Sequence, residues 1–152
     1  MKKISPRYAI TLLTAALFSI SALQAETIDI YPAEKDMTRE IQAAIHLSRE
    51  KKHAPVTIQL RQGDYHISRS HASHQLYYIS NTTSSSENPH PVKHIGLWLK
   101  GLRNVIIDGG GARLITHGEM TTFVIDSCEN IVLRNFTLVA ADPTVPEMTV
   151  LE

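Results

Sequence analysis

The stretch LRNVIIDGGGARLI, residues 102–115, is nearly repeated 26 residues later by CENIVLRNFTL, residues 128–138. In both stretches a polar turn ending in Asn precedes a short aliphatic run, and a second polar turn precedes another short apolar run. Strands this short cannot bury their apolar side alone, so the repetition predicts coils stacked on one another. We therefore predict an all-β fold, formed by the first coils of a right-handed parallel β-helix.

The residues before this repeat predict a cap for the first coil. Residues 26–30 alternate polar and apolar side chains, as a strand does, and Asp36 is suited to be the N-cap of a helix that runs to about Lys52. The apolar face of this helix is formed by Ile41, Ala44 and Ile45. An atypical terminal unit must cover the open apolar end of a stacked fold. We therefore expect an N-terminal capping α-helix.

Further strands and turns follow from local composition. Strands are predicted at 56–60 and 65–67 around a tight turn, at 76–80, at 95–99 and at 148–151. The segment 81–89 has almost no apolar content and is predicted to be a surface loop, and a turn is predicted around residues 140–143. Residues 26–152 are therefore interpreted as one domain, the cap and first coils of a β-helix that is truncated at its C-terminus.

The first 25 residues have the pattern of a secretory signal peptide. Lys2, Lys3 and Arg7 supply the positive start, an apolar run covers residues 9–23, and Ala25 is suited to the cleavage position. An uncleaved membrane anchor is the alternative, although the apolar run is short for a membrane span. We expect residues 1–25 to be removed, which predicts a secreted or periplasmic protein without a membrane segment.

Charge and cysteine content narrow the choice of partners only a little. The chain has 15 Lys and Arg against 15 Asp and Glu, and removal of residues 1–25 leaves a net charge of −3. No excess of positive charge indicates nucleic acid binding. The single cysteine, Cys128, cannot form an internal disulfide, and we predict that it is a buried, inert thiol.

The eight histidines raise the question of a metal site. The most closely spaced are His66, His71 and His74, with His90 and His94 further along the chain. A zinc site uses three or four ligands on a rigid frame, usually with one short characteristic spacing, and these intervals match no such motif. We therefore predict solvated loop histidines, no metal site and no cofactor.

Carboxylates matter if the fold is a β-helix, because many proteins with this fold cut or modify polysaccharides. The candidates in the repeat region are Asp108, Glu119, Asp126, Glu129, Asp142 and Glu147. A glycosidase needs two carboxyl groups at a defined separation, and Asp108 and Asp126 both follow strands. An Asp before Gly at a strand end is also typical of a turn, and for Asp108 and Asp126 we favour the turn role.

Two asparagines, Asn104 and Asn130, occupy equivalent positions of the two repeated stretches. We predict that they stack on one another in successive turns and satisfy polar groups there. Acceptor patterns for N-glycosylation occur at Asn81 and Asn135, but such patterns are frequent by chance. Neither feature predicts a binding site.

Several runs of the sequence resemble a known family. Residues 41–45, 56–58 and 63–67 look like the N-terminal cap of the pectate-lyase-like β-helix superfamily. Other runs resemble the N-terminal part of the family 110 glycoside hydrolases, the bacterial α-1,3-galactosidases. These runs are 78–83 with 87–89, 93–97 with 100–101, 107–121, 128–131 and 142–148. The resemblance covers the chain from about residue 27 to its end.

This resemblance implies an exo-acting enzyme that removes terminal α-1,3-linked galactose, as on blood-group-B-type glycans, with inversion and without a metal. Its substrate would be a galactose-terminated glycan. Family members are several times longer, and their catalytic carboxylates are expected on later coils. We therefore expect the catalytic residues beyond Glu152, assign none here, leave substrate-binding residues and oligomeric state open, and expect the chain to be an inactive N-terminal fragment.

Two other functions remain open at this point. One is a non-catalytic carbohydrate-binding or structural β-helix module, because a fold does not fix a function. The other is a uronate polysaccharide lyase, which needs Ca²⁺ held by clustered acidic ligands and a Lys or Arg base. The repeat region shows no Asp cluster, which makes the lyase the weaker alternative.

Overall fold

The structure is a computed structural model that describes residues 25–51, 54–77 and 92–142. In chain order its elements are β1 (Glu26–Ile30), α1 (Thr38–Glu50), β2 (Val56–Leu60), β3 (Asp64–Ser68), the short 3₁₀ turn η1 (Arg69–His71), β4 (Ser73–Leu76), β5 (Val92–Lys100), β6 (Arg103–His117), β7 (Thr121–Asp126) and β8 (Glu129–Ala140). Strands dominate, and α1 is the one α-helix of the described residues. The predicted all-β class is confirmed.

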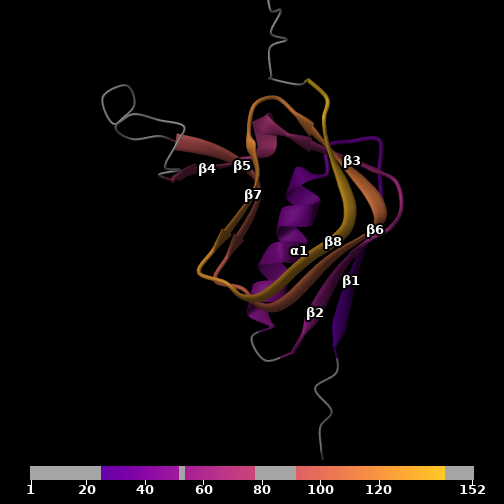
Figure 1. Cartoon of the computed structure of the whole chain (residues 1–152), viewed down its shortest axis with the longest axis vertical. Helices are drawn as coiled ribbons and strands as arrows, with labels where there is room; N and C mark the ends of the chain where they lie inside the picture. Colours follow the sequence, from indigo (N-terminus) through magenta and orange to yellow (C-terminus); the bar gives the residue numbers. More distant parts are fainter. Residues whose placement is uncertain (1–24, 52–53, 78–91, 143–152) are drawn as a thin grey trace, which may run out of the picture.

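The strands form two sheets that lie on opposite sides of the fold, with α1 seen between them in Figure 1. Sheet A contains β1, β2, β6, β3 and β8, and all of its pairings are parallel. Sheet B contains β4, β5 and β7, where β5 and β7 are parallel and β4 is antiparallel to β5. Parallel neighbours need a crossover between them. Between β1 and β2 the chain passes through α1, whereas between β6 and β8 it crosses to β7 of sheet B.

The 26-residue offset of the sequence recurs in the strand pairing. In sheet B, Ile95 of β5 is paired with Thr121 of β7. In sheet A, Arg103 of β6 is paired with Glu129 of β8. Equivalent residues of the two repeated stretches therefore lie side by side on neighbouring strands.

The sequence predicted that glycines 109–111 form a turn between two strands. In the structure they form a corner inside the long strand β6. Gly110 and Gly111 have positive φ angles of 53° and 88°, which bend the strand without ending it. In β8 the corresponding bend is made by Asn135 alone, with φ 59°. Three residues on β6 face one on β8, so the register beyond the corner begins with Ala112 paired with Phe136.

The core lies between the two sheets and under the buried face of α1. The predicted apolar helix face is confirmed, because Ile41, Ala44 and Ile45 are all buried. Tyr65 is fully buried, and its hydroxyl donates to the carbonyl oxygens of Ile30 (2.7 Å) or Arg61 (2.8 Å), so the phenol is satisfied inside the core. The remaining fully buried core comes from inward-facing aliphatic residues of β2, β3, β5 and β6.

The N-cap of α1 lies one residue later than predicted. Met37, not Asp36, is the N-cap residue of α1. The Asp36 carboxylate still serves the helix end, because its Oδ1 atom accepts a hydrogen bond from the Thr38 amide at 2.8 Å. At the other end α1 stops at Glu50, and Lys52 lies outside the described residues.

Other predicted boundaries agree to within a few residues. Strands β1 and β2 have the predicted bounds, and β3 and β5 extend beyond theirs by one to three residues at each end. The strand predicted at 76–80 shares only Leu76 with β4 (Ser73–Leu76); Tyr77 is not part of a strand, and residues 78–80 lie outside the described residues. The loop at 81–89 and the strand at 148–151 lie outside the described residues.

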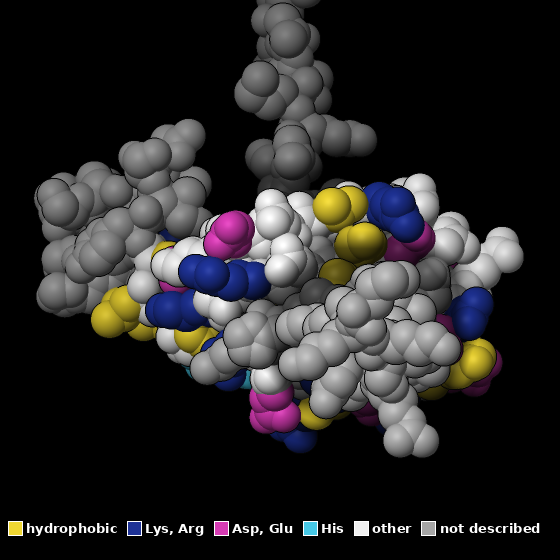
Figure 2. Space-filling model, turned by 90° about the horizontal axis from the view of Figure 1, so that it is seen from below, with side chains coloured by type: hydrophobic (Ala, Val, Ile, Leu, Met, Phe, Trp, Pro, Cys, Tyr) yellow, Lys and Arg dark blue, Asp and Glu magenta, His cyan; other side chains and the backbone are white. Residues whose placement is uncertain are grey.

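The outer surface mixes charges of both signs, as the face drawn in Figure 2 shows. Ion pairs join neighbouring strands or elements of sheet A, among them Arg61 with Asp29 at 2.9 Å and Arg113 with Asp64 at 3.2 Å. Exposed pairs of this kind add little stability. In the described part of the chain, no helix has the length and apolar character that crossing a membrane would require.

Candidate functional site

Asp108 lies at the end of the first half of β6. As predicted for a turn residue, its side chain bonds the backbone two residues on, but that turn is a corner inside β6 and not the end of a strand. Its Oδ1 atom accepts hydrogen bonds from the Gly110 amide (3.0 Å) and from Asn135 Nδ2 (3.1 Å). Its Oδ2 atom lies 2.8 Å from Arg134 Nε. The Gly110 amide, followed by the Asn135 and Arg134 side chains, lowers the pKa of this buried carboxyl. Asp108 is therefore an ionised corner residue.

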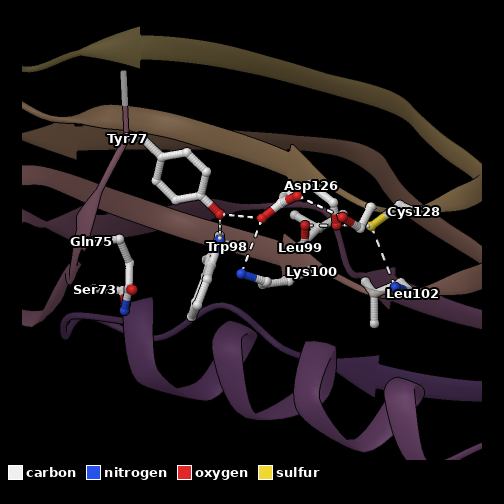
Figure 3. A network of polar contacts seen from close by, with 10 residues as sticks. Ser73, Gln75, Tyr77, Trp98, Leu99, Lys100, Leu102, Asp126 and Cys128 are labelled. Atoms are coloured by element: carbon white, nitrogen blue, oxygen red, sulfur yellow. Dashed lines mark hydrogen bonds and ion pairs between the residues drawn. The ribbon is translucent and has the colours of Figure 1, made fainter. Parts of the chain in front are cut away.

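Asp126 ends β7 and belongs to a different network on sheet B, drawn in Figure 3. Its Oδ2 atom accepts a hydrogen bond from the Tyr77 hydroxyl at 2.6 Å and lies 3.2 Å from Lys100 Nζ. Its Oδ1 atom accepts a hydrogen bond from the Ser127 hydroxyl at 2.8 Å. The Tyr77 hydrogen bond is the main cause of a lowered pKa at Asp126, and those with Ser127 and Lys100 add to it.

These two carboxylates are unsuited to act as a general acid. A glycosidase acid must hold a proton near neutral pH, which requires a raised pKa. Asp108 and Asp126 have lowered values, and they lie in different sheets. The sequence-based preference for structural roles agrees with this geometry.

The remaining acidic candidates are scattered. Glu119 is exposed between β6 and β7, and Asp142 is exposed after β8. Glu129 pairs with Arg103 at 3.5 Å on the outer surface. Glu147 lies outside the described residues. The structure brings none of these side chains together with Asp108 or Asp126 through a hydrogen bond within the described ranges.

Four histidines lie in strands and contact one another in pairs. His66 and His117 lie on neighbouring strands of sheet A, and their Nδ1 and Nε2 atoms are 2.7 Å apart. His74 and His94 pack edge to face with ring centroids 4.2 Å apart. The expectation of loop positions is therefore wrong for His66, His74 and His94, which lie in strands and contact another ring, although His74 is exposed to solvent.

His71 does lie outside the sheets, in η1, where its Nδ1 atom is 3.1 Å from Asp36 Oδ2. His90 lies outside the described residues. The described residues contain no group of three or more His, Cys, Asp or Glu side chains arranged to hold a metal ion. Burial, together with nearby Arg69 and His74, lowers the pKa of His94, and Arg69 Nη2 lies 2.8 Å from its Nε2 atom.

The predicted turn asparagines are confirmed as a stack. Asn104 and Asn130 both have a positive φ of 55°, and Asn130 Nδ2 donates to Asn104 Oδ1 at 3.0 Å. Asn tolerates this left-handed conformation better than most residues. Cys128, beside this turn, is partly buried rather than fully buried, and its Sγ atom accepts a weak hydrogen bond from the Leu102 amide at 3.4 Å.

A cluster that sequence reasoning missed joins Tyr77, the residue after β4, to β5 and β7. The Trp98 indole donates to the Tyr77 hydroxyl at 2.8 Å, and the Tyr77 hydroxyl in turn donates to Asp126 (Figure 3). Lys100 Nζ lies 5.2 Å from the centre of the Trp98 ring. The side chain of Gln42 on α1 also bonds both the amide and the carbonyl of Trp98, each at 2.9 Å.

This cluster is satisfied internally and holds elements together. It links α1, β5, β7 and the residue that follows β4, which are far apart in sequence. The outward position of Trp98 in an alternating strand was the signal available from the sequence. That signal could not reveal the partners, because they come from three other elements.

Two open depressions lie on the outer surface. One, of about 550 Å³, is at the glycine corner and is lined by Gly110, Gly111, Asn135, Phe136 and Thr137. The other, of about 420 Å³, lies beside β3 and is lined by Pro32, Ala33, Glu34, Asp64 and His66. The first has neutral lining residues, and the second carries two carboxylates.

The chain is similar in sequence to several known proteins. No family model matches it. It is 44% identical over 129 residues to alpha-1,3-galactosidase A of Bacteroides thetaiotaomicron, a match that covers 85% of this chain and 23% of that enzyme. It is 32% identical over 129 residues to alpha-1,3-galactosidase B of Parabacteroides distasonis, covering 84% of this chain and 19% of the relative.

A third match, to alpha-1,3-galactosidase A of Bacteroides fragilis, has 38% identity over 96 residues and covers 63% of this chain and 16% of that enzyme. The chain thus spans less than a quarter of the length of each of these curated relatives. Identity at this level over most of the chain establishes common descent. The chain is homologous to the α-1,3-galactosidases and corresponds to a part of them.

Proposed function

We propose that this chain is part of an exo-acting glycoside hydrolase that removes terminal α-1,3-linked galactose from glycans, including blood-group-B-type glycans, with inversion. The observation that carries the proposal is the 44% identity over 85% of the chain to an alpha-1,3-galactosidase A. Matches to both A and B enzymes support the reaction class rather than a single substrate. The substrate is then a galactose-terminated glycan.

The scaffold proposed for this enzyme is a right-handed parallel β-helix in which α1 is the N-terminal cap. The parallel pairing of β1, β2, β6 and β8, with crossovers to sheet B after β2 and after β6, supports stacked coils. The buried face of α1 packs on β5 of sheet B and on β1, β2 and β3 of sheet A. This arrangement is what a terminal cap of a stacked fold requires.

The catalytic carboxylates are proposed to lie beyond Glu152, in a longer protein of which this chain is the N-terminal fragment. The chain spans 23% of the Bacteroides thetaiotaomicron relative, which leaves most of that enzyme unmatched. Asp108 and Asp126 are held ionised by hydrogen bonds and serve the corner and the sheet B network. The chain alone is therefore expected to be inactive.

Residues 1–25 are proposed to be a signal peptide that directs the mature domain, residues 26–152, to the periplasm or the medium. The positive start and the apolar run of residues 9–23 support this. Expression in a Gram-negative host, followed by fractionation and intact-mass measurement, tests it. A cytoplasmic product that retains Met1 would contradict the proposal.

A chimera tests the enzymatic proposal directly. The matched segment of the Bacteroides thetaiotaomicron enzyme is replaced by residues 27–152 of this chain, and hydrolysis of a B-type trisaccharide is measured. We expect turnover within about tenfold of the parent, because the scaffold is supplied by a homologous segment. A matched chimera with Ile107→Asp, which puts a charge into the core, should lose the activity with the fold.

Two further readouts decide the details of the proposal. Nuclear magnetic resonance of the galactose first released by the chimera should show the β anomer, as inversion of an α-linkage requires. A chimera that melts like the parent but hydrolyses no α-1,3-galactoside would contradict the function. Hydrolysis of a p-nitrophenyl α-galactoside by the isolated chain would contradict the placement of the catalytic carboxylates.

A further inference from the structure

The groove at the glycine corner arises from a difference in length between two neighbouring corners. Strand β6 turns through three glycines between Asp108 and Ala112, whereas β8 turns through Asn135 alone between Arg134 and Phe136. The longer corner therefore projects beyond the shorter one. The space left beside the shorter corner is the groove of about 550 Å³.

The projecting wall of this groove is bare backbone. Gly110 and Gly111 are exposed, and a Cβ atom added to Gly111 would meet only Gln62 Cγ, at 3.9 Å. Gly109, by contrast, packs directly on β8, because a Cβ atom there would lie 2.4 Å from Phe136 Cβ. Gly110 is also close to its neighbours, because a Cβ atom there would lie 3.0 Å from both Gln59 Nε2 and the Leu60 carbonyl oxygen. The corner is thus packed at Gly109 and Gly110 and open at Gly111.

The two charged residues that flank the groove residues in sequence, Asp108 and Arg134, are paired with each other. Asp108 is buried beneath the corner and paired with Arg134 at 2.8 Å, and Asn135 Nδ2 donates to the same carboxylate at 3.1 Å. The lining residues themselves carry no charge. Within the described part of the chain, no group donates to Asn135 Oδ1, and Thr137, which also lines the groove, adds an exposed hydroxyl.

From this geometry we propose that the corner groove is a binding subsite for one neutral sugar unit of the glycan. Neutral amide, hydroxyl and peptide groups are suited to hydroxyl-rich ligands without charge, and the volume falls within the range of small-ligand sites, roughly 300–1,000 Å³. The inference rests on the proposed function for the class of ligand. It assigns these residues a binding role, with no part in bond cleavage.

Titration of the full chain with methyl α-galactopyranoside and with galactosyl-α-1,3-galactose, followed by amide chemical shifts, tests the subsite. We expect saturable shifts at Gly110, Gly111 and residues 135–137, with a dissociation constant on the order of millimolar because the groove is shallow. Galacturonate at the same concentration should shift these amides less. The charged comparator thus tests the neutrality of the site.

A matched pair of variants decides whether binding occurs in the groove. Thr137→Trp fills it from an exposed position and should weaken binding roughly tenfold or more. Thr27→Trp makes the same change at an exposed position of β1, which is separated from β8 by β2 and β6 in sheet A. This variant should leave binding unchanged. Amide spectra of both variants should otherwise match the parent, which shows that they fold.

The proposal is overturned if no saturable shift appears, if the shifts lie outside the corner, or if both variants bind equally. These failures are distinct from failure of the proposed function. An active chimera with no binding at the corner would keep the enzyme and remove the subsite. Corner binding combined with a folded but inactive chimera would keep the subsite and remove the enzyme.

Discussion

Leu114 and Leu138 are the same residue type at paired positions of β6 and β8, yet Leu114 is fully buried and Leu138 is 50% exposed. Leu99 of β5 and Ile125 of β7 show the same contrast, with exposures of 0% and 51%. Strands β2 and β3 cover one side of β6, and β8 covers the other. Among the described residues, β8 has a neighbour on one side only. In a stacked fold, burial is therefore a property of the neighbours on both sides of a strand.

The largest expected effect comes from truncating this matched pair. Leu114→Ala removes a fully buried side chain and should lower the free energy of unfolding by about 3–4 kcal/mol. Leu138→Ala should cost about 1 kcal/mol, because half of its surface already faces solvent. Urea unfolding followed by circular dichroism measures both. Equal losses would show that the end of the sheet is covered in solution.

The same pair sharpens the comparison inside the chimera with the Bacteroides thetaiotaomicron enzyme. If a further coil covers β8 there, the cost of Leu138→Ala should rise towards that of Leu114→Ala. The cost at Leu114 should stay the same, since its neighbours are already present.

A second prediction concerns the glycine corner of β6, where this buried strand packs on the open strand β8. Gly109→Ala places a Cβ atom 2.5 Å from the Asn135 carbonyl oxygen and should destabilise the chain by about 2–3 kcal/mol. Gly101→Ala is the control, because a Cβ atom there meets nothing within 4 Å and only the φ of 64° is unfavourable. It should cost roughly 1 kcal/mol. A Gly101 effect as large as that at Gly109 would mean that backbone conformation, and not contact with β8, sets the cost.

A third prediction concerns Asp36, whose carboxylate lies just before the start of α1. Burial raises the pKa of Asp36, but hydrogen bonds from Ser68, Thr38 and His71 outweigh burial and hold the pKa at about 2. The lowered pKa contributes about 2 kcal/mol of stability above the unfolded-state pKa of 3.8. This contribution is lost as the pH falls from about 4 through 2.

Asp36→Asn should therefore lower the free energy of unfolding at pH 7 by up to about 2 kcal/mol, and the difference from the parent should shrink towards pH 2. Asp29→Asn is the control, since its carboxylate forms an exposed ion pair with Arg61. It should change stability by at most about 0.5 kcal/mol. A parent–variant difference for Asp36 that stays constant with pH would contradict the assigned role.

The smallest expected effect is at the asparagine stack, which joins Asn104 of β6 to Asn130 of β8. Asn130→Asp keeps the shape and the tolerance for positive φ but removes the Nδ2 donor to Asn104. Loss of this exposed hydrogen bond, with two oxygens left facing one another, should cost about 1 kcal/mol. Thermal unfolding measures it, and Asn130→Gly, which keeps the backbone conformation, should cost less. An unchanged melting temperature in Asn130→Asp would show that the stack contributes nothing.

Much of the fold was predictable because it is local. The alternation in β1 and β2, the apolar face of α1 and the stacked asparagines all follow from side-chain periodicity along short stretches. The positions of the histidines were not predictable. His66 and His117 meet because β3 and β6 are paired across 51 residues of sequence, which no local pattern encodes.

The features of the candidate site also divide into those that local sequence predicted and those that depend on strand pairing. The turn role of Asp108 was predictable from the glycine that follows it, since the side chain bonds an amide two residues away. The groove beside it was not, because it depends on how the corners of β6 and β8 differ in length once the strands are in register. Likewise, the network of Tyr77, Trp98 and Asp126 required three separate elements to meet.

The sequence by itself determined the strand-rich class, the 26-residue offset and the kinship with the α-1,3-galactosidases, because apolar periodicity and residue identity are properties of the chain. Only the tertiary structure decided which apolar residues are buried, which histidines touch and where a groove opens. These depend on neighbours brought together by strand pairing. Leu114 and Leu138 are identical in sequence terms and differ because one is covered on both sides.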